Sequence, residues 1–490
     1  MQTPSAPLGP KGWIAPALAA LCGVALLLAL SASHGPGLDS DGAEYLAAAQ
    51  SLLEGRGWIG VEGEPYVLWP PLQPLLLALP GGLGCAQGER AVALHALALA
   101  ADALLAAAIA WRLTASRLTA AVASFAVVAI ALPTATMAWS EPAFTALVLA
   151  ALAALLRFGE RRSRGSLAVL ACCCALALAQ RYVGVLLLGC VALALLVDRD
   201  GGKLGRRALR ALAVSLAAAL PVLAWALRNA LIAPSAAANR GPASDSWSYD
   251  LRCALAQFVV LEPAPQALLT VGASALLALG ALALLRRGAA RPELAVALFP
   301  FAFTAGLVVL RHWVQFDPLD ARLLSPAHAV GALLGAVGAH ELFVGRWRGL
   351  AALALGAWIA FALQRQFVVT RATLARAQSD GLGLYDNAAW RSSEALAALR
   401  AAPPAGAGFT NEPHALFLHA GLRARALPTR PSVYPRLYER WSAAPASERW
   451  ILWFPFGGRA VLPQPEQGIE LERTRAWADA ELWSMRGKTR

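Results

Sequence analysis

The chain has 490 residues, of which 58% are hydrophobic and only 15% are charged, and its mean hydropathy is +0.54. Soluble globular proteins carry about a quarter charged residues, so this composition argues against a soluble enzyme or binding module. The formal net charge is +12, which in a soluble protein would suggest nucleic-acid binding. In so apolar a chain we interpret the charge as arginine-rich loops on one side of a membrane, and we expect no nucleic-acid partner.

Apolar blocks of roughly 20 residues without a charge recur along the chain, which is the length that a helix needs to cross about 30 Å of hydrocarbon. The first block, Ile14–Leu30, lacks a small-residue cleavage site and is followed by further blocks, so it predicts a membrane span rather than a cleaved signal. About eleven transmembrane helices are predicted in all, near Ile14–Ser33, Arg90–Leu113, Leu118–Thr136, Pro142–Phe158, Ser166–Ala179, Val183–Val197, Ala208–Ile232, Pro265–Leu285, Leu294–Leu310, Ser325–Leu342 and Gly349–Phe367.

Basic residues gather in alternate loops between these helices. Because arginine-rich and lysine-rich loops stay on the cytoplasmic side of a membrane, this pattern places the N-terminus in the cytoplasm. The outer side then carries the tail after Phe367 and three long loops, which are His34–Glu89, Ala233–Ala264 and Arg311–Arg322.

A shorter apolar stretch, Leu72–Leu83, lies inside the first outer loop and follows Pro70 and Pro71. It is too short to span a membrane comfortably, and counting it as a span would break the alternation of basic loops. We therefore predict that residues 34–89 form an outer loop containing interfacial helices.

The tail beyond Val368 is more polar and contains no long apolar run. Its patterning predicts helices at Ala388–Ala401 and Ala415–Ala420, and strands at Ala407–Thr410 and Arg449–Phe456. The predicted fold is a polytopic all-α membrane domain over residues 1–367, followed by a small α/β domain over residues 368–490 on the outer face. We detect no inverted repeat of the kind that many transporters show.

Three carboxylates, Asp39, Asp41 and Glu44, follow the first span within six residues. The apolar residues around Tyr45 have helical spacing, which predicts an amphipathic helix at the membrane interface with the aspartates at its start. Either aspartate could cap that helix. A carboxylate here could instead act as a general base or help to bind a divalent cation, so these interpretations stay open.

Charged residues also lie at the outer ends of later helices. Glu141 follows Ser140 and precedes Pro142, an arrangement typical of a helix start, but a carboxylate at this depth needs a partner or a cation. Arg181 and Arg322 lie on the same side of the membrane and carry guanidinium groups suited to phosphate. Arg181 could instead extend to lipid headgroups, and Arg322 could pair locally with Asp317 or Asp320.

Two further features are ambiguous. Asp102 lies in the middle of a predicted span, where we favour a hydrogen bond between packed helices over a functional acid. Cys85 and Cys253 fall in predicted outer loops and could form a disulfide, although nothing in the sequence pairs them.

Several segments, taken in order, resemble the GT-C class of membrane glycosyltransferases, and most of all the bacterial relatives of the protein O-mannosyltransferases and lipid A aminoarabinose transferases. The resemblance touches nearly the whole chain. Its segments are Asp41-xxx-Tyr45 with Leu52-Leu53-x-Gly55-x-Gly57, Trp69-Pro70-Pro71-Leu-Gln-Pro74, Ser140-Glu141-Pro142-x-Phe144, Gln180-Arg181-Tyr182-x-Gly184, Arg322-Leu-Leu-Ser-Pro326, Thr410-Asn411-Glu-Pro413, Gly421-Leu-Arg423 and Leu427-Pro428.

This resemblance implies an inverting transfer of a sugar from a polyprenyl-phosphate donor, on the periplasmic face of a bacterial inner membrane. It implies that Asp41 is the catalytic base, that Glu141 is a second active-site acid, and that Arg181 and Arg322 hold the donor phosphate. The acceptor would be a lipid, a glycan or a protein.

Many members also use a divalent metal ion, such as Mg, Mn or Zn, for which Asp41 and Glu141 would be the ligands here. The chain departs from the family pattern at Gly42, where a second acid is usual, and at Leu323, where a tyrosine is common. Metal use therefore stays open. The resemblance further places in the substrate pocket Asp39, Glu44, Tyr45, Tyr66, Trp69, Gln73 and Tyr182.

Two other functions remain as alternatives. A transporter or lipid flippase should place charged groups near the bilayer midplane, where Asp102 is the main such residue. An accessory membrane protein that binds partners through its outer domain would need no acidic cluster in the first outer loop.

Overall fold

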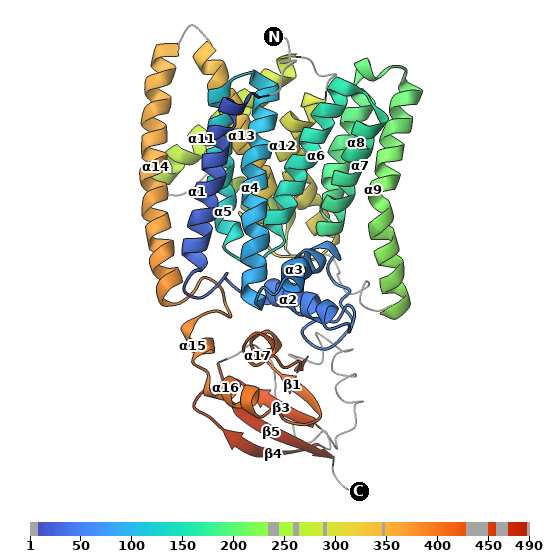
Figure 1. The fold of residues 1–490 in the computed structure, drawn as a ribbon, viewed down its shortest axis with the longest axis vertical. Coiled ribbons are helices and arrows are strands. Elements are labelled where there is room, and N and C mark those ends of the chain that lie inside the picture. Colours follow the sequence, from blue (N-terminus) through green and yellow to red (C-terminus); the bar gives the residue numbers. More distant parts are fainter. Residues whose placement is uncertain are drawn as a thin grey trace. The chain divides into compact units, whose positions relative to one another are not determined.

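The structure, a computed structural model, describes residues 8–233, 245–257, 264–287, 292–344, 348–427, 449–456 and 469–487 (Figure 1). The chain divides into two compact units. The first comprises Met1–Ala32, Val67–Leu76 and Ala91–Ala375, and the second comprises Ser33–Tyr66, Leu77–Arg90 and Arg376–Arg490.

The first unit is helical. Its segments are rich in alanine and leucine, which are strong helix formers. Each predicted span is a helix whose ends are displaced by a few residues, except that the last one extends well beyond its predicted end. These helices are α1 (Ile14–Ser31), α4 (Gln87–Thr114), α5 (Arg117–Ala135), α6 (Glu141–Arg161), α7 (Arg164–Gln180), α8 (Gly184–Val197), α9 (Leu204–Ile232), α11 (Ala264–Arg287), α12 (Glu293–Trp313), α13 (Ser325–Val344) and α14 (Arg348–Ser379).

Two differences from the predicted helices stand out. Helix α14 continues to Ser379, so the predicted domain boundary at residue 367 falls inside a helix. A further helix, α10 (Trp247–Ala256), lies in the predicted outer loop between α9 and α11. Arg311 near the end of α12 holds it through a charge pair with Asp250 and a 2.6 Å pair with Asp245.

In the described part of the chain, six helices are long and apolar enough to cross a membrane. They are α4, α5, α6, α9, α12 and the segment Pro10–Ser31 that contains α1. Helices α7 and α8 are apolar but shorter, with 17 and 14 residues. The helices are therefore those of a polytopic membrane protein, while the predicted number of about eleven spans stays a prediction.

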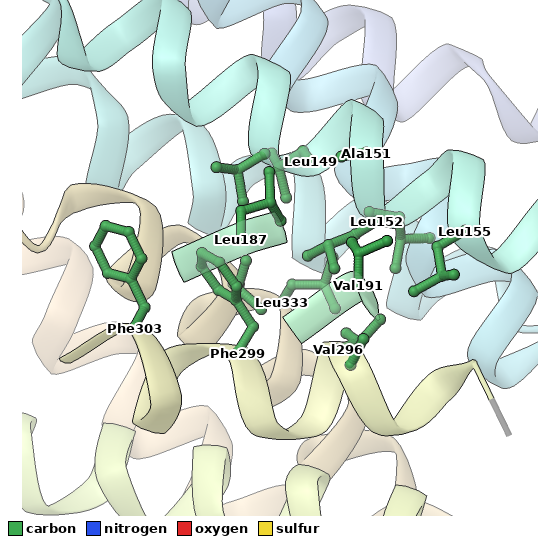
Figure 2. Close-up of a cluster of buried hydrophobic side chains, with 14 of the residues drawn as sticks. Leu149, Ala151, Leu152, Leu155, Leu187, Val191, Val296, Phe299, Phe303 and Leu333 are labelled. Carbon is green, nitrogen blue, oxygen red and sulfur yellow. The ribbon is translucent and has the colours of Figure 1, made fainter. Parts of the chain in front are cut away.

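The core of the first unit is formed where α6, α8, α12 and α13 meet (Figure 2). Phe299 and Phe303 on α12 stack with their ring centroids 5.2 Å apart, and Phe303 lies 6.2 Å from Phe144 on α6. Between membrane helices such packing acts through van der Waals contact, because lipid tails are as apolar as the side chains. Phe144 lies one turn after Glu141, so this core fixes the end of α6 that carries that carboxylate.

Helices α11 and α13 approach each other at glycines. A Cβ atom added to Gly280 would collide with the carbonyl oxygen of Leu334, and one added to Gly338 would collide with the carbonyl oxygen of Leu276. The two backbones therefore lie in direct contact, as is common for small residues between membrane helices. Gly335 differs, because its nearest such neighbour is Leu276 Cβ at 3.8 Å, an ordinary contact.

We predict that Gly338→Ala lowers the thermal unfolding midpoint in detergent, because the new methyl group forces two helix backbones apart at a cost of about 1–3 kcal/mol. Gly335→Ala is the matched control, and it should leave the midpoint unchanged or raise it slightly, since alanine favours helix by up to about 1 kcal/mol. Equal midpoints for the two variants would contradict the close approach.

The second unit is built on a sheet with strand order β2-β1-β3-β5-β4. Strand β1 is parallel to β2 and β3, whereas β5 is antiparallel to β3 and β4. The strands are β1 (Ala407–Thr410), β2 (Arg425–Ala426), β3 (Arg449–Trp453), β4 (Ile469–Ala476) and β5 (Glu481–Gly487), and the helices of the tail are α15 (Ala388–Arg391), α16 (Glu394–Ala401) and α17 (Pro413–Ala420).

Two strands and one helix of the tail were predicted at these places, and β1, β3 and α17 confirm them. The predicted helix Ala388–Ala401 is instead two helices, because Ser393 accepts a hydrogen bond from Leu396 N at 3.1 Å and starts α16 anew. Strands β2, β4 and β5 were not predicted.

The first outer loop contributes helix α2 (Ser40–Leu53) to this second unit, where it packs against α17. Leu38 donates its backbone N–H to the buried carboxylate of Asp386 at 3.2 Å, and its carbonyl accepts from Tyr385 N at 3.0 Å. The predicted interfacial helix is present as α3 (Leu72–Gly82). Most of the first outer loop thus belongs to one compact unit with the tail, a grouping that the predicted domains did not contain.

Candidate functional site

Glu141 is the first residue of α6, after Ser140 at the N-cap and before Pro142. Its side chain is 1% exposed. An ionised carboxylate buried to this degree is stable only with charged or hydrogen-bonding partners.

Two arginines distant in sequence meet this carboxylate. Arg181 follows the last residue of α7, and its Nη1 lies 2.6 Å from Glu141 Oε1. Arg322 lies in the turn before α13, and its Nε donates to the same oxygen at 2.7 Å. The guanidinium of Arg322 also stacks 4.5 Å above the centroid of the Trp139 ring.

Amide side chains hold the turn that precedes Glu141. Gln73 donates to the carbonyl of Trp139 at 3.1 Å, and Gln180 donates to the carbonyl of Ser140 at 3.2 Å. Gln180 also donates to Gln73 Oε1. Arg181 Nη1 adds a 2.8 Å bond to the hydroxyl of Ser140. The position of Glu141 is therefore fixed by segments from three parts of the chain.

The site carries more positive than negative charge, because one buried carboxylate faces two guanidinium groups. Asp317 adds little, since it lies 3.8 Å from Arg322 Nη1 and is 75% exposed. The other local rival, Asp320, instead accepts a hydrogen bond from Leu323 N at 2.9 Å. Two fixed guanidiniums with a surplus charge are suited to bind a phosphate group.

We predict that Glu141→Gln lowers the thermal unfolding midpoint strongly, because removing one partner of a buried charge cluster costs about 3–5 kcal/mol. Glu160→Gln is the control, since its pair with Arg112 at 3.3 Å is partly exposed on both sides and should contribute only about 0–1 kcal/mol. If both variants unfold at the same temperature, the buried cluster does not stabilise the unit.

In the second unit, the acidic cluster starts helix α2. Asp39 is the N-cap and accepts a hydrogen bond from Gly42 N at 2.9 Å. Asp41 lies in the first turn of α2 and is partly exposed. The side-chain cap is therefore Asp39, and the proposed base Asp41 follows it on a rigid helix rather than on a loop.

Glu44 lies one turn further along α2, and its side chain is 14% exposed. Burial raises the pKa of this carboxyl to about 7, and the charges of Glu62 and Asp41 raise it too, whereas a 3.2 Å hydrogen bond from Val61 N and the charge of Arg423 lower it. The Nε2 atom of His414 lies 3.9 Å away, and burial lowers the pKa of that imidazole to about 4.

Glu44 therefore makes stability depend on pH. Its pKa is higher in the folded protein than the ordinary 4.5, so the folded state binds the extra proton and loses stability as pH rises through about 7. Glu44→Gln removes this penalty, and we predict that the variant gains up to about 3 kcal/mol over wild type between pH 5 and pH 8. Thermal midpoints of both proteins across that range test the prediction, and a difference independent of pH would contradict it.

The remaining predicted pocket residues are placed as follows. Tyr45 and Tyr66 are each 2% exposed and pack inside the second unit. The backbone carbonyl of Trp69 accepts a 3.2 Å hydrogen bond from Trp225, while Tyr182 beside Arg181 is 37% exposed. Their contact with a substrate stays a prediction.

The structure also shows the surroundings of the residues whose roles the sequence left undecided. Both carboxylate oxygens of Asp102 are buried without a hydrogen-bond partner among the described residues, so the helix-packing bond that we favoured for it is wrong. Cys85 and Cys253 are free thiols.

Among the residues described, no three His, Cys, Asp or Glu side chains gather as a metal site would require. Glu141 itself is engaged by two cations and is poorly suited to bind a third.

Sequence reasoning missed the residues that support these groups. Ser140 and Gln180 stand beside Glu141 and Arg181 in the segments noted above, but nothing in their local pattern predicts that they meet. Arg423 was noted only as part of a tail motif, although it contacts α2.

The fold has clear relatives among solved structures. ArnT from Cupriavidus metallidurans matches in its apo state with a TM-score of 0.62 and 14% identity, over 96% of this chain and 98% of that one. The same protein bound to undecaprenyl phosphate matches with a TM-score of 0.64 and 13% identity, over 97% and 98% of the two chains. This chain has the fold of the GT-C glycosyltransferases.

A second GT-C relative supports the same assignment. The archaeal oligosaccharyltransferase AglB from Archaeoglobus fulgidus, in complex with an inhibitory peptide and a dolichol-phosphate, matches with a TM-score of 0.54 and 13% identity, over 91% of this chain and 70% of that one. No protein-family profile and no curated protein sequence matches. The predicted resemblance to the GT-C class is thus confirmed through the fold.

Proposed function

We propose that this protein is a membrane glycosyltransferase that takes a sugar from a polyprenyl-phosphate donor and transfers it to a lipid, glycan or protein acceptor. The observation that carries the proposal is the pair of partly buried arginines on the buried carboxylate of Glu141. It occurs in a fold shared with a structure of ArnT bound to undecaprenyl phosphate and one of AglB with a dolichol-phosphate.

In the proposed reaction, an acceptor hydroxyl attacks the anomeric carbon of the donor sugar with inversion. The new bond joins the acceptor oxygen to that carbon, the bond from the carbon to the phosphate oxygen breaks, and polyprenyl phosphate leaves with the electron pair. Asp41 takes the hydroxyl proton, a step that contributes about 10²- to 10⁴-fold when the base is well placed.

Arg181 and Arg322 would bind the donor phosphate and stabilise the charge that it gains as it leaves. Fixed cations act in this way at low cost, because they do not reorganise during the reaction, and a single such group contributes about 10²- to 10³-fold. Glu141 would act as the anchor that keeps both guanidiniums in place, since it is buried and bonds each of them.

A divalent cation has no assigned step in this mechanism. The earlier expectation that Asp41 and Glu141 bind Mg, Mn or Zn needs Glu141 to be available to a metal, and both arginines already contact its Oε1 atom. The surplus positive charge of the arginine pair would supply the stabilisation that a metal gives in related chemistry.

We further propose that the N-terminus lies in the cytoplasm and that the active site and tail domain face the outer side. The basic clusters support this orientation, because those between α6 and α7 and between α8 and α9 fall at the ends of these helices away from Glu141 and Arg181.

The test uses purified protein in nanodiscs with a panel of radiolabelled polyprenyl-phosphate sugars. We expect wild type to yield labelled product, and Asp41→Asn to lose at least about 100-fold in rate, because an amide cannot accept the proton. Asp41→Asn should still bind undecaprenyl phosphate.

Arg322→Lys tests the phosphate site separately. It keeps the charge opposite Glu141 but loses the planar fork, so undecaprenyl phosphate should bind about tenfold more weakly or worse. Arg252→Lys on α10 is the control and should bind as wild type does, because Arg252 is exposed and donates to the carbonyl of Ser248 within its own helix. Full activity of Asp41→Asn would refute its role as base, and donor movement across the bilayer without transfer would favour a flippase.

A further inference from the structure

Arg423, in the tail, lies partly buried against helix α2 of the first outer loop. Its Nη2 donates to the carbonyl of Ala47 at 3.1 Å, and its Nη1 donates to the hydroxyl of Ser51 at 3.1 Å. Burial lowers the pKa of this guanidinium, yet its donors are matched to oxygen acceptors. A guanidinium can make several such bonds in one plane, whereas a lysine ammonium cannot.

The same guanidinium reaches the segment that follows α2. Nη1 lies 3.3 Å from the carbonyl oxygen of Ile59 and 3.1 Å from that of Gly60. On the next residue, Val61 donates its N–H to Glu44 of α2 at 3.2 Å. The segment at residues 59–61 is therefore bound on its carbonyl side by Arg423 and on its amide side by Glu44.

The contact residues on α2 share one face with the proposed base. Asp41, Glu44, Ala47 and Ser51 are spaced by three, three and four residues, and residues at this spacing lie on one side of a helix. Bonds to Ala47, Ser51 and Glu44 therefore fix how α2 is rotated about its axis. That rotation sets the direction of the Asp41 side chain.

A sharp turn at a glycine precedes Arg423 in the tail. Helix α17 is followed by its C-cap residue Gly421, which adopts a left-handed conformation with φ of +72°. This conformation is accessible to glycine without strain and turns the chain sharply at the helix end. Arg423 follows two residues later, packs over the ring of Phe417 at 5.5 Å and precedes strand β2.

We propose that Arg423 is a positioning residue for sugar transfer, which holds α2 in the rotation that directs Asp41 at the acceptor hydroxyl. The tail domain would thus take part in catalysis without contacting the reacting atoms. The kinetic consequence rests on the proposed function, but the contact between Arg423 and α2 can be tested without it.

The experiment compares wild type, Arg423→Lys and Ser51→Ala in nanodiscs. Arg423→Lys should lower kcat by about 10- to 100-fold, because small displacements of a catalytic group have effects of that size, while the KM for the donor and the binding of undecaprenyl phosphate stay close to wild type. Ser51→Ala removes one acceptor and should lower kcat only a few-fold. Arg473→Lys is the control, since Arg473 pairs with Glu481 on the neighbouring strand at the surface of the sheet.

Hydrogen exchange of α2 is measured on the same proteins. Arg423→Lys should accelerate exchange in α2 and residues 59–61 but not in strands β3 and β5. Unchanged kcat in Arg423→Lys would overturn the proposal, as would faster exchange throughout the second unit, which would indicate a general structural role. If wild type shows no transfer, the proposed function fails instead, and the exchange rates still decide whether Arg423 holds α2.

Discussion

The structure of the first unit depends on one electrostatic constraint, which is that the carboxylate of Glu141 is buried and must be neutralised. Arg181 and Arg322 meet this requirement from two other helix ends, at 2.6 and 2.7 Å. Because the charges are removed from water, each partner is held in a narrow range of positions. The three helix ends are thereby joined into a site whose surplus charge is positive, which is the property that phosphate binding needs.

The second unit places its charges by a different principle. Here the chain uses hydrogen bonds to the backbone, with Asp39 capping α2, Glu44 accepting from Val61 and Arg423 donating to three carbonyls. Such bonds orient a helix more than they stabilise it, because each replaces a bond to water. Such bonds would let the second unit control the direction of Asp41, the proposed base.

A shared fold at 13–14% identity says little about substrates, since a fold accommodates many functions. The proposed lipid-phosphate chemistry is supported by the site itself, with two guanidiniums on one anchoring acid. The sugar and the acceptor depend on the shape of a pocket that no motif describes.

The sequence by itself determined the helices, because apolar blocks bounded by charges are a local property of the chain, and it located Asp41, Glu141, Arg181 and Arg322 as candidates. It also predicted strands β1 and β3, but not the β4–β5 hairpin, because charged residues outnumber apolar ones in β4 and leave little strand pattern to detect. Only the tertiary structure decided that Glu141 pairs with both arginines and that Arg423 binds α2. These contacts join residues 40 or more positions apart. A sequence pattern shows which groups need partners but not which partners the fold brings to them.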